Sequence, residues 1–161
     1  MKTWIHAAIV PMAAALVTAA SAQGLPEGYT CCNLHHDKDF ISDANWIHAP
    51  MIAAGAKIKV VSYGSNVANV EIDGQPMRIG HEYGRKQESL EAFISKLVVK
   101  SSPRGKIDRY PGPVRAAISE GKVIPGMTRE QVIIAVGYPP THKTESLDAK
   151  VWNHWQSRAG R

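Results

Sequence analysis

The chain has 161 residues, of which 44% are hydrophobic and 20% are charged, and its formal net charge is +5. This composition is typical of a globular protein and excludes an intrinsically disordered one, while the length suits one ordinary domain or two small ones. The mildly positive charge is compatible with an acidic partner or an anionic membrane surface. The sequence lacks a basic stripe with interleaved aromatic residues, which argues against nucleic-acid binding.

Residues 1–22 have the pattern of a secretory signal peptide. Lys2 gives a positive start, residues 4–17 are mostly apolar, and a small-x-small motif ends at Ala22. The alternative is a membrane anchor, but the apolar run is interrupted by His6 and Pro11 and is shorter than the roughly 20 residues that span a bilayer. We therefore expect cleavage after Ala22 and a periplasmic protein. Because no cysteine follows the cleavage site, we expect no lipid attachment there.

Residues 23–50 show neither helical nor strand periodicity and contain several turn-forming residues, so we expect an extended arm with turns. The cysteines of the chain, Cys31 and Cys32, are adjacent there. In an oxidising compartment they could form a disulfide with each other, a bridge to another chain, or remain free thiols.

The same arm contains a cluster of potential metal ligands, although their spacing matches no recognised zinc motif. An alternative function is therefore a periplasmic metal or small-ligand binding protein. Its candidate ligands are Cys31, Cys32, His35 and His36, with Asp37 next to them.

Residues 51–99 predict a small β-rich module with a helix. Three β-rich runs, Lys57–Tyr63, Val67–Ile72 and Gln75–Ile79, are separated by short connections, and Asp73-Gly74 is a strong type I′ hairpin signal. We expect an antiparallel meander. Such a meander needs a cover on its apolar face.

The next segment supplies that cover. Apolar residues recur at helical spacing, which predicts an amphipathic helix of about 12 to 15 residues. The stripe consists of Leu90, Phe93, Ile94, Leu97 and Val98.

The sequence contains no recognisable catalytic motif. His81 and Glu82 begin the only segment that invites comparison with a metalloprotease, but Arg85 occupies the position where HExxH requires its second histidine. A nucleophile elbow, a phosphate-binding loop and a dinucleotide fingerprint are also absent. We therefore predict a protein that is not an enzyme, with no catalytic residue and no cofactor.

Residues 100–112 are rich in proline, glycine and serine and are expected to form a linker. Its cations Arg104, Lys106 and Arg109 are candidate contacts for an acidic partner or for lipid phosphates. The competing interpretation is an ordinary solvated linker.

Residues 113–161 predict two helices and a strand. The first helix begins near Pro113 and ends at Gly121. The last strand is expected over Val151–Gln156, with Trp152 and Trp155 on opposite faces. As an unpaired edge, that strand would bind a partner through these two tryptophans.

The sequence contains signals for both the start and the end of the second helix. Thr128 and Gln131 form a capping box, and Met127 and Val132 occupy the positions of a hydrophobic staple. Gly137 then supplies a left-handed C-terminal residue, and Pro139 with Pro140 prevents continuation.

In order and spacing, these residues resemble the SmpA/OmlA (BamE-like) family over about residues 113–156. The motif that carries the resemblance consists of Gly126, Met127, Thr128, Gln131, Val132, Gly137, Pro139 and Trp152. The resemblance implies a non-enzymatic α+β domain that helps outer-membrane barrel proteins assemble or keeps the envelope intact. It implies as partners envelope or outer-membrane proteins, including barrel-assembly components, with peripheral contact to an anionic membrane.

Together these patterns predict an α+β fold, with an N-terminal antiparallel β meander and covering helix followed by a BamE-like helix-helix-strand module. Family members continue into two further strands, whereas this sequence stops at Arg161, so the sheet of this module is expected to be incomplete. Three explanations stay open: strands of the meander complete the sheet, the module is a shortened version, or a partner completes it.

Overall fold

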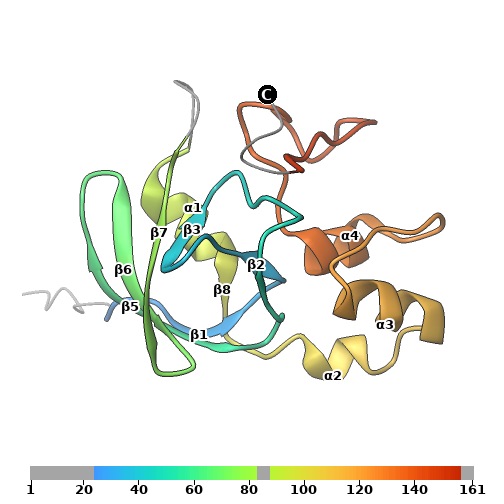
Figure 1. The fold of residues 1–161 in the computed structure, drawn as a ribbon, viewed down its shortest axis with the longest axis horizontal. Coiled ribbons are helices and arrows are strands. Elements are labelled where there is room, and N and C mark those ends of the chain that lie inside the picture. Colours follow the sequence, from blue (N-terminus) through green and yellow to red (C-terminus); the bar gives the residue numbers. More distant parts are fainter. Residues whose placement is uncertain (1–23, 83–87, 157–161) are drawn as a thin grey trace, which may run out of the picture.

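The computed structural model describes residues 24–82 and 88–156 and shows an α+β fold, as predicted, with a curled sheet followed by helices (Figure 1). The predicted signal peptide and Arg85 lie outside the described residues. Among those residues, no helix is both long enough and apolar enough to cross a membrane.

The predicted meander forms the centre of the main sheet. Antiparallel pairing joins β5 (Lys57–Tyr63) to β6 (Val67–Ile72) and β6 to β7 (Gln75–Gly80). The hairpin residues Asp73 and Gly74 have φ angles of 46° and 82°. A type I′ turn requires positive φ at both positions, which explains why this pair connects the strands.

The segment predicted to be an extended arm contains strands that extend this sheet, which corrects that prediction. β1 (Glu27–Thr30) pairs with β5, and β3 (Phe40–Ser42) pairs in parallel with β7. A separate two-stranded sheet joins β2 (Leu34–His35) to β4 (Met51–Ile52). The arm lacks periodicity because its strands are only two to four residues long.

The covering helix α1 spans Leu90–Leu97 and is shorter than predicted. Ser89 caps it by accepting a 3.1 Å hydrogen bond from the Ala92 amide. Val98 lies outside the helix and begins the short strand β8 (Val98–Val99). β8 pairs with β1 at the edge of the main sheet. The strand order of this sheet is β3-β7-β6-β5-β1-β8. The buried face of α1 and the buried face of the sheet together form the first hydrophobic core.

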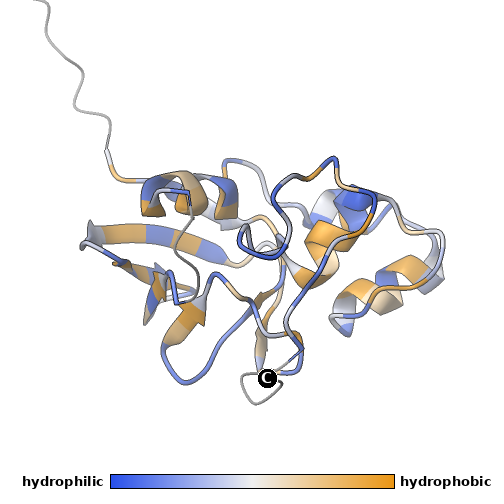
Figure 2. Cartoon of the chain, turned by 90° about the horizontal axis from the view of Figure 1, so that it is seen from above, coloured by the Kyte–Doolittle hydropathy of each residue, from blue (hydrophilic) through white to orange (hydrophobic). Residues whose placement is uncertain are grey.

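Residues predicted to form a linker contain the short helix α2 (Arg104–Ile107), so they are not a free connection. α3 (Gly112–Ser119) and α4 (Arg129–Val136) follow at the predicted places. Figure 2 shows that α4 is hydrophilic in its first turn and hydrophobic beyond it.

The helices pack around a second core that is distinct from the face covered by α1. Its buried members are Ala54, Ile118, Ile134, Ala135 and Val136. The buried residues of α3 and α4 therefore lie in the second core, but Ile133 of α4 is partly buried and packs against the first core, which includes residues of the meander.

The predicted strand at Val151–Gln156 is absent, and this prediction is wrong. The segment is irregular, and the carbonyl oxygens of Trp155 and Gln156 accept hydrogen bonds from the amides of Ile47 and His48, at 3.2 and 3.0 Å. It is held against the N-terminal half of the chain and presents no strand edge.

Candidate functional site

α4 is fixed at its start by the predicted capping box. The Thr128 hydroxyl accepts a hydrogen bond from the Gln131 amide at 3.3 Å, and the Gln131 side-chain oxygen accepts one from the Thr128 amide at 2.9 Å. Two of the four unpaired N–H groups of a helix start are thereby satisfied. Met127 and Val132, at the staple positions, both pack against the second core.

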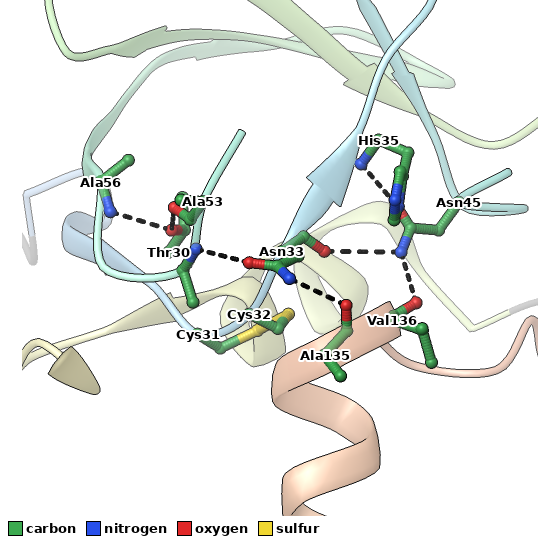
Figure 3. Close-up of a disulfide and its surroundings, with 11 residues drawn as sticks. Thr30, Cys31, Cys32, Asn33, His35, Asn45, Ala53, Ala56, Ala135 and Val136 are labelled. Carbon is green, nitrogen blue, oxygen red and sulfur yellow. Dashed lines mark hydrogen bonds between the residues drawn. A yellow bond between two sulfur atoms is a disulfide. The ribbon is translucent and has the colours of Figure 1, made fainter. Parts of the chain in front are cut away.

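The end of α4 is held by two buried asparagines of the N-terminal half (Figure 3). Asn33 Nδ2 donates to the carbonyl oxygen of Ala135 at 2.9 Å, and Asn45 Nδ2 donates to that of Val136 at 2.7 Å. Carbonyl groups at a helix end have no partner within the helix, so these amides replace water there. Gly137 follows with φ 77°, which only glycine adopts easily.

A cavity of about 810 Å³ opens between β8, α2, α4 and the irregular segment after α4, and we call it the junction cavity. Its walls come from parts of the chain that are far apart in sequence. The lining residues used below are Cys31, Val99, Lys106, Arg109, Arg129, Glu130, Ile133, Ile134, Tyr138, Leu147, Asp148 and Trp152.

The wall of the junction cavity combines aliphatic and aromatic groups. Ile133 and Ile134 face it from α4, and Val99 faces it from β8. Tyr138 and Trp152 add two rings from the segment that follows α4. Burial raises the pKa of the Tyr138 hydroxyl, so it stays neutral at physiological pH.

Charged groups surround this apolar wall. Lys106 Nζ forms an ion pair with Glu130 Oε1 at 2.6 Å, whereas Arg129 Nη1 and Asp148 Oδ1 are 3.8 Å apart. The Arg129 guanidinium lies 5.6 Å from the centre of the Trp152 ring, within the range of a cation–π interaction. These contacts connect α2, α4 and the C-terminal segment around one opening.

Of the five residues predicted to contact a partner, three line this cavity: Lys106, Arg109 and Trp152. Arg104 does not, because its Nε donates to the Ala54 carbonyl at 3.5 Å. Trp155 does not either, since its indole N–H donates to His142 Nε2 at 3.2 Å.

The sequence did not indicate Ile133 or Arg129 as site residues, and both line the cavity. Ile133 of α4 is partly buried, packs against the first core and lines the cavity. Arg129 stands in the first turn of α4, and no sequence pattern indicated its position beside Trp152.

The candidate metal ligands of the arm do not form a site. Within residues 24–82 and 88–156, no group of three or more histidine, cysteine or acidic side chains is placed to hold a metal ion. Burial lowers the pKa of His35, and His36 Nδ1 lies 2.7 Å from the Lys38 carbonyl oxygen.

The adjacent cysteines Cys31 and Cys32 form a disulfide with each other, which answers the question that the sequence left open. Cys32 is fully buried, whereas Cys31 is 8% exposed and reaches the wall of the junction cavity. Figure 3 places the disulfide next to Asn33. Through Cys31, the disulfide forms part of the wall of the junction cavity.

His81 begins the segment that was compared with a metalloprotease, and its side chain interacts with Asp43. Its Nδ1 lies 3.0 Å from Oδ2 of Asp43, whose other carboxylate oxygen accepts a hydrogen bond from the Glu82 amide at 3.1 Å. Both side chains are largely buried. The pair fastens the end of β7 to the turn that follows β3.

Compared with known proteins, the chain matches no family model, no curated protein and no solved structure.

Proposed function

We propose that this chain is an exported, non-enzymatic binding or scaffold protein of the cell envelope, which assists outer-membrane protein assembly or envelope integrity. The observation that carries the proposal is that Trp152, Lys106 and Arg109 line one cavity with a mainly apolar wall. The sequence also indicates these three residues as candidates for partner binding. A concave site with an apolar wall and a few polar groups is the usual form of a binding site.

The resemblance to the SmpA/OmlA family supports the choice of partner. The motif residues form the capping box and the left-handed stop of α4, and α4 contributes Ile133 and Ile134 to the cavity. Components of the outer-membrane barrel-assembly machinery are therefore the first candidates. These same motif residues have capping and packing roles, so they specify the position of the site and not its chemistry.

We assign no catalytic residue. Among the described residues, the histidine rings with side-chain hydrogen bonds interact with Asp43, Trp155 and the Lys38 carbonyl. None of these partners is a hydroxyl or thiol nucleophile.

Affinity capture tests the proposal. The full chain with its own leader and a C-terminal tag is expressed in a cell with an outer membrane, and the envelope is solubilised and captured. We expect barrel-assembly components to be recovered with the native protein and lost with Trp152→Ala. Trp155→Ala is the matched control, because that ring lies outside the cavity. If a folded native protein recovers none of these components, the assembly role is wrong.

A small-ligand binding protein is the second candidate. The volume of about 810 Å³ falls within the range of roughly 300–1,000 Å³ that is typical of small-molecule pockets. Cys31, one of the residues proposed for that alternative, reaches the cavity wall.

A further inference from the structure

We propose that the junction cavity takes a small amphiphilic monoanion, which has an apolar body and one carboxylate or similar anionic group. This inference rests on the proposed function in one respect: the junction cavity is the binding site of the protein. It adds the chemical class of what enters the cavity.

The wall requires a ligand with a substantial apolar part. Ile133, Ile134 and Val99 offer only hydrocarbon to the cavity, and the Trp152 ring offers an apolar face. Burying apolar surface against them contributes roughly 25 cal/mol per Å², whereas burying an unpaired polar group there costs free energy. A sugar or a nucleotide would leave many polar groups without partners on this wall.

The charges that line the cavity favour one negative charge on the ligand. Three cations, Lys106, Arg109 and Arg129, face two carboxylates, Glu130 and Asp148. Lys106 is already paired with Glu130 at 2.6 Å. Arg109 forms no ion pair with the described residues, so its guanidinium is the surplus positive charge.

Arg129 adds a second guanidinium to the cavity wall, although its Nη2 already donates to the carbonyl oxygens of Asp148 and Ala149, at 3.3 and 2.9 Å. Arg129 Nη1 lies 3.8 Å from Asp148 Oδ1, and both side chains are more than half exposed, so this ion pair contributes little to stability. A ligand carboxylate that reaches Arg109 from the apolar wall would also be attracted by Arg129. A guanidinium binds a carboxylate through two parallel hydrogen bonds, which makes it the better receptor for this group.

The same arrangement disfavours a cationic ligand. Glu130 is engaged by Lys106, and Asp148 is fully exposed on its side chain, so neither offers a desolvated negative site. A cation within the cavity would meet Arg109 without compensation. The cavity should therefore discriminate between amphiphiles that have the same chain and different head groups.

Three ligands with the same ten-carbon chain test this inference: decanoate, 1-decanol and decyltrimethylammonium. Binding to the full purified chain is measured by calorimetry and by tryptophan fluorescence, below the solubility limit of 1-decanol and below the micelle concentrations of the two ionic compounds. We expect decanoate to bind about tenfold more tightly than decanol and the cation to bind most weakly. Equal affinity for the three, or no binding of decanoate to the folded protein, overturns the proposal.

Two arginine variants form the matched pair. Arg109→Gln should abolish the preference for decanoate over decanol while decanol still binds. Arg104→Gln should leave the preference unchanged, because Arg104 is a nearby exposed arginine, at the start of α2, that does not line the cavity. If the two variants behave alike, the assignment of the anion to Arg109 is wrong. Circular dichroism establishes that both are folded.

This experiment and the affinity capture can fail independently. If barrel-assembly components are recovered through Trp152 but decanoate does not bind, the proposed function holds and the ligand class is wrong. If decanoate binds with the expected preference but no assembly component is recovered, the ligand class holds and the assembly role is wrong.

Discussion

The side-chain amide of Asn33 donates a hydrogen bond of 2.9 Å to the carbonyl oxygen of Ala135, in the last turn of α4. It also donates to the Ile118 carbonyl near the end of α3, at 2.7 Å, and its oxygen accepts from the Ala54 amide at 2.8 Å. One buried side chain thus joins both helices to the N-terminal half. Because α4 forms one wall of the junction cavity, this connection also positions the site.

Asn33→Ala should destabilise the protein by on the order of 3 kcal/mol. The substitution leaves the buried carbonyls of Ile118 and Ala135 and the Ala54 amide without their partner, and each such group costs about 1–3 kcal/mol unless the structure relaxes. Chemical denaturation followed by circular dichroism measures the change. Asn69→Ala is the control, because the exposed Asn69 amide bonds only to the Ser62 hydroxyl. Equal effects of the two variants would contradict the role of Asn33.

Two glycines with positive φ angles differ in the space around them, and Gly137 in addition has ψ −179°, a combination that is essentially restricted to glycine. Gly126 and Gly137 have φ angles of 86° and 77°, but a Cβ at Gly126 meets open space, whereas one at Gly137 would lie 2.2 Å from Asn45 Nδ2. Gly126→Ala should therefore cost only about 1–2 kcal/mol, for the backbone conformation. Gly137→Ala should cost clearly more, because Asn45 must also release the Val136 carbonyl. Thermal unfolding compares them, and a smaller effect at Gly137 would refute the close approach.

Local signals in the sequence predicted local structure well. The capping box of Thr128 and Gln131, the stop at Gly137 and the turn at Asp73-Gly74 each depend on residues within a few positions of one another. Hydrogen bonds of this range are specified by spacing alone. The fold class followed from the same patterns.

Contacts between distant segments could not be predicted in this way. The pairing of β1 with β5 and β8 depends on only two or three residue pairs, too few to give a periodic pattern. Asn33 and Asn45 look like ordinary polar residues of an arm, and only the packing of α4 against them explains their burial. The predicted strand at residues 151–156 is instead an irregular segment whose carbonyl groups at Trp155 and Gln156 bond to the amides of residues 47 and 48, a backbone contact that no side-chain pattern indicates.

The candidate site was predicted in part. Lys106 and Arg109 were selected as exposed cations and Trp152 as an exposed ring, and these properties can be read from composition and context. The contribution of Ile133 could not be separated from core packing, because a helix face that lines a cavity has the same periodicity as one that lines a core.

Thr128→Ala should destabilise the protein by on the order of 1 kcal/mol, because it removes the acceptor for the Gln131 amide. Thr128→Ser keeps the hydroxyl and should lie close to the native protein. Urea unfolding of the three proteins provides the comparison. A serine variant as unstable as the alanine variant would mean that the methyl group and not the cap is responsible.

Stability should also decrease as the pH falls below about 6.5, because of two buried histidines. Burial lowers the pKa of His35 and of His154 from their ordinary value of 6.5. The unfolded chain then binds a proton more readily than the folded chain, so acid favours unfolding from about pH 6.5 down to each lowered pKa. Above about pH 6.5 both imidazoles are neutral in the folded and in the unfolded chain, so they contribute no pH dependence to stability there.

The measurement is the free energy of unfolding in urea at pH 7.5, 6.5 and 5.5, a range that stays above the ordinary pKa values of carboxylates. His35→Gln replaces the imidazole with an uncharged polar side chain and should reduce the loss of stability between pH 6.5 and 5.5, whatever its effect at pH 7.5. His154→Gln should do the same, because desolvation is the stated cause at both positions. A native protein that is equally stable at pH 7.5 and 5.5 would show that neither imidazole stays neutral through burial.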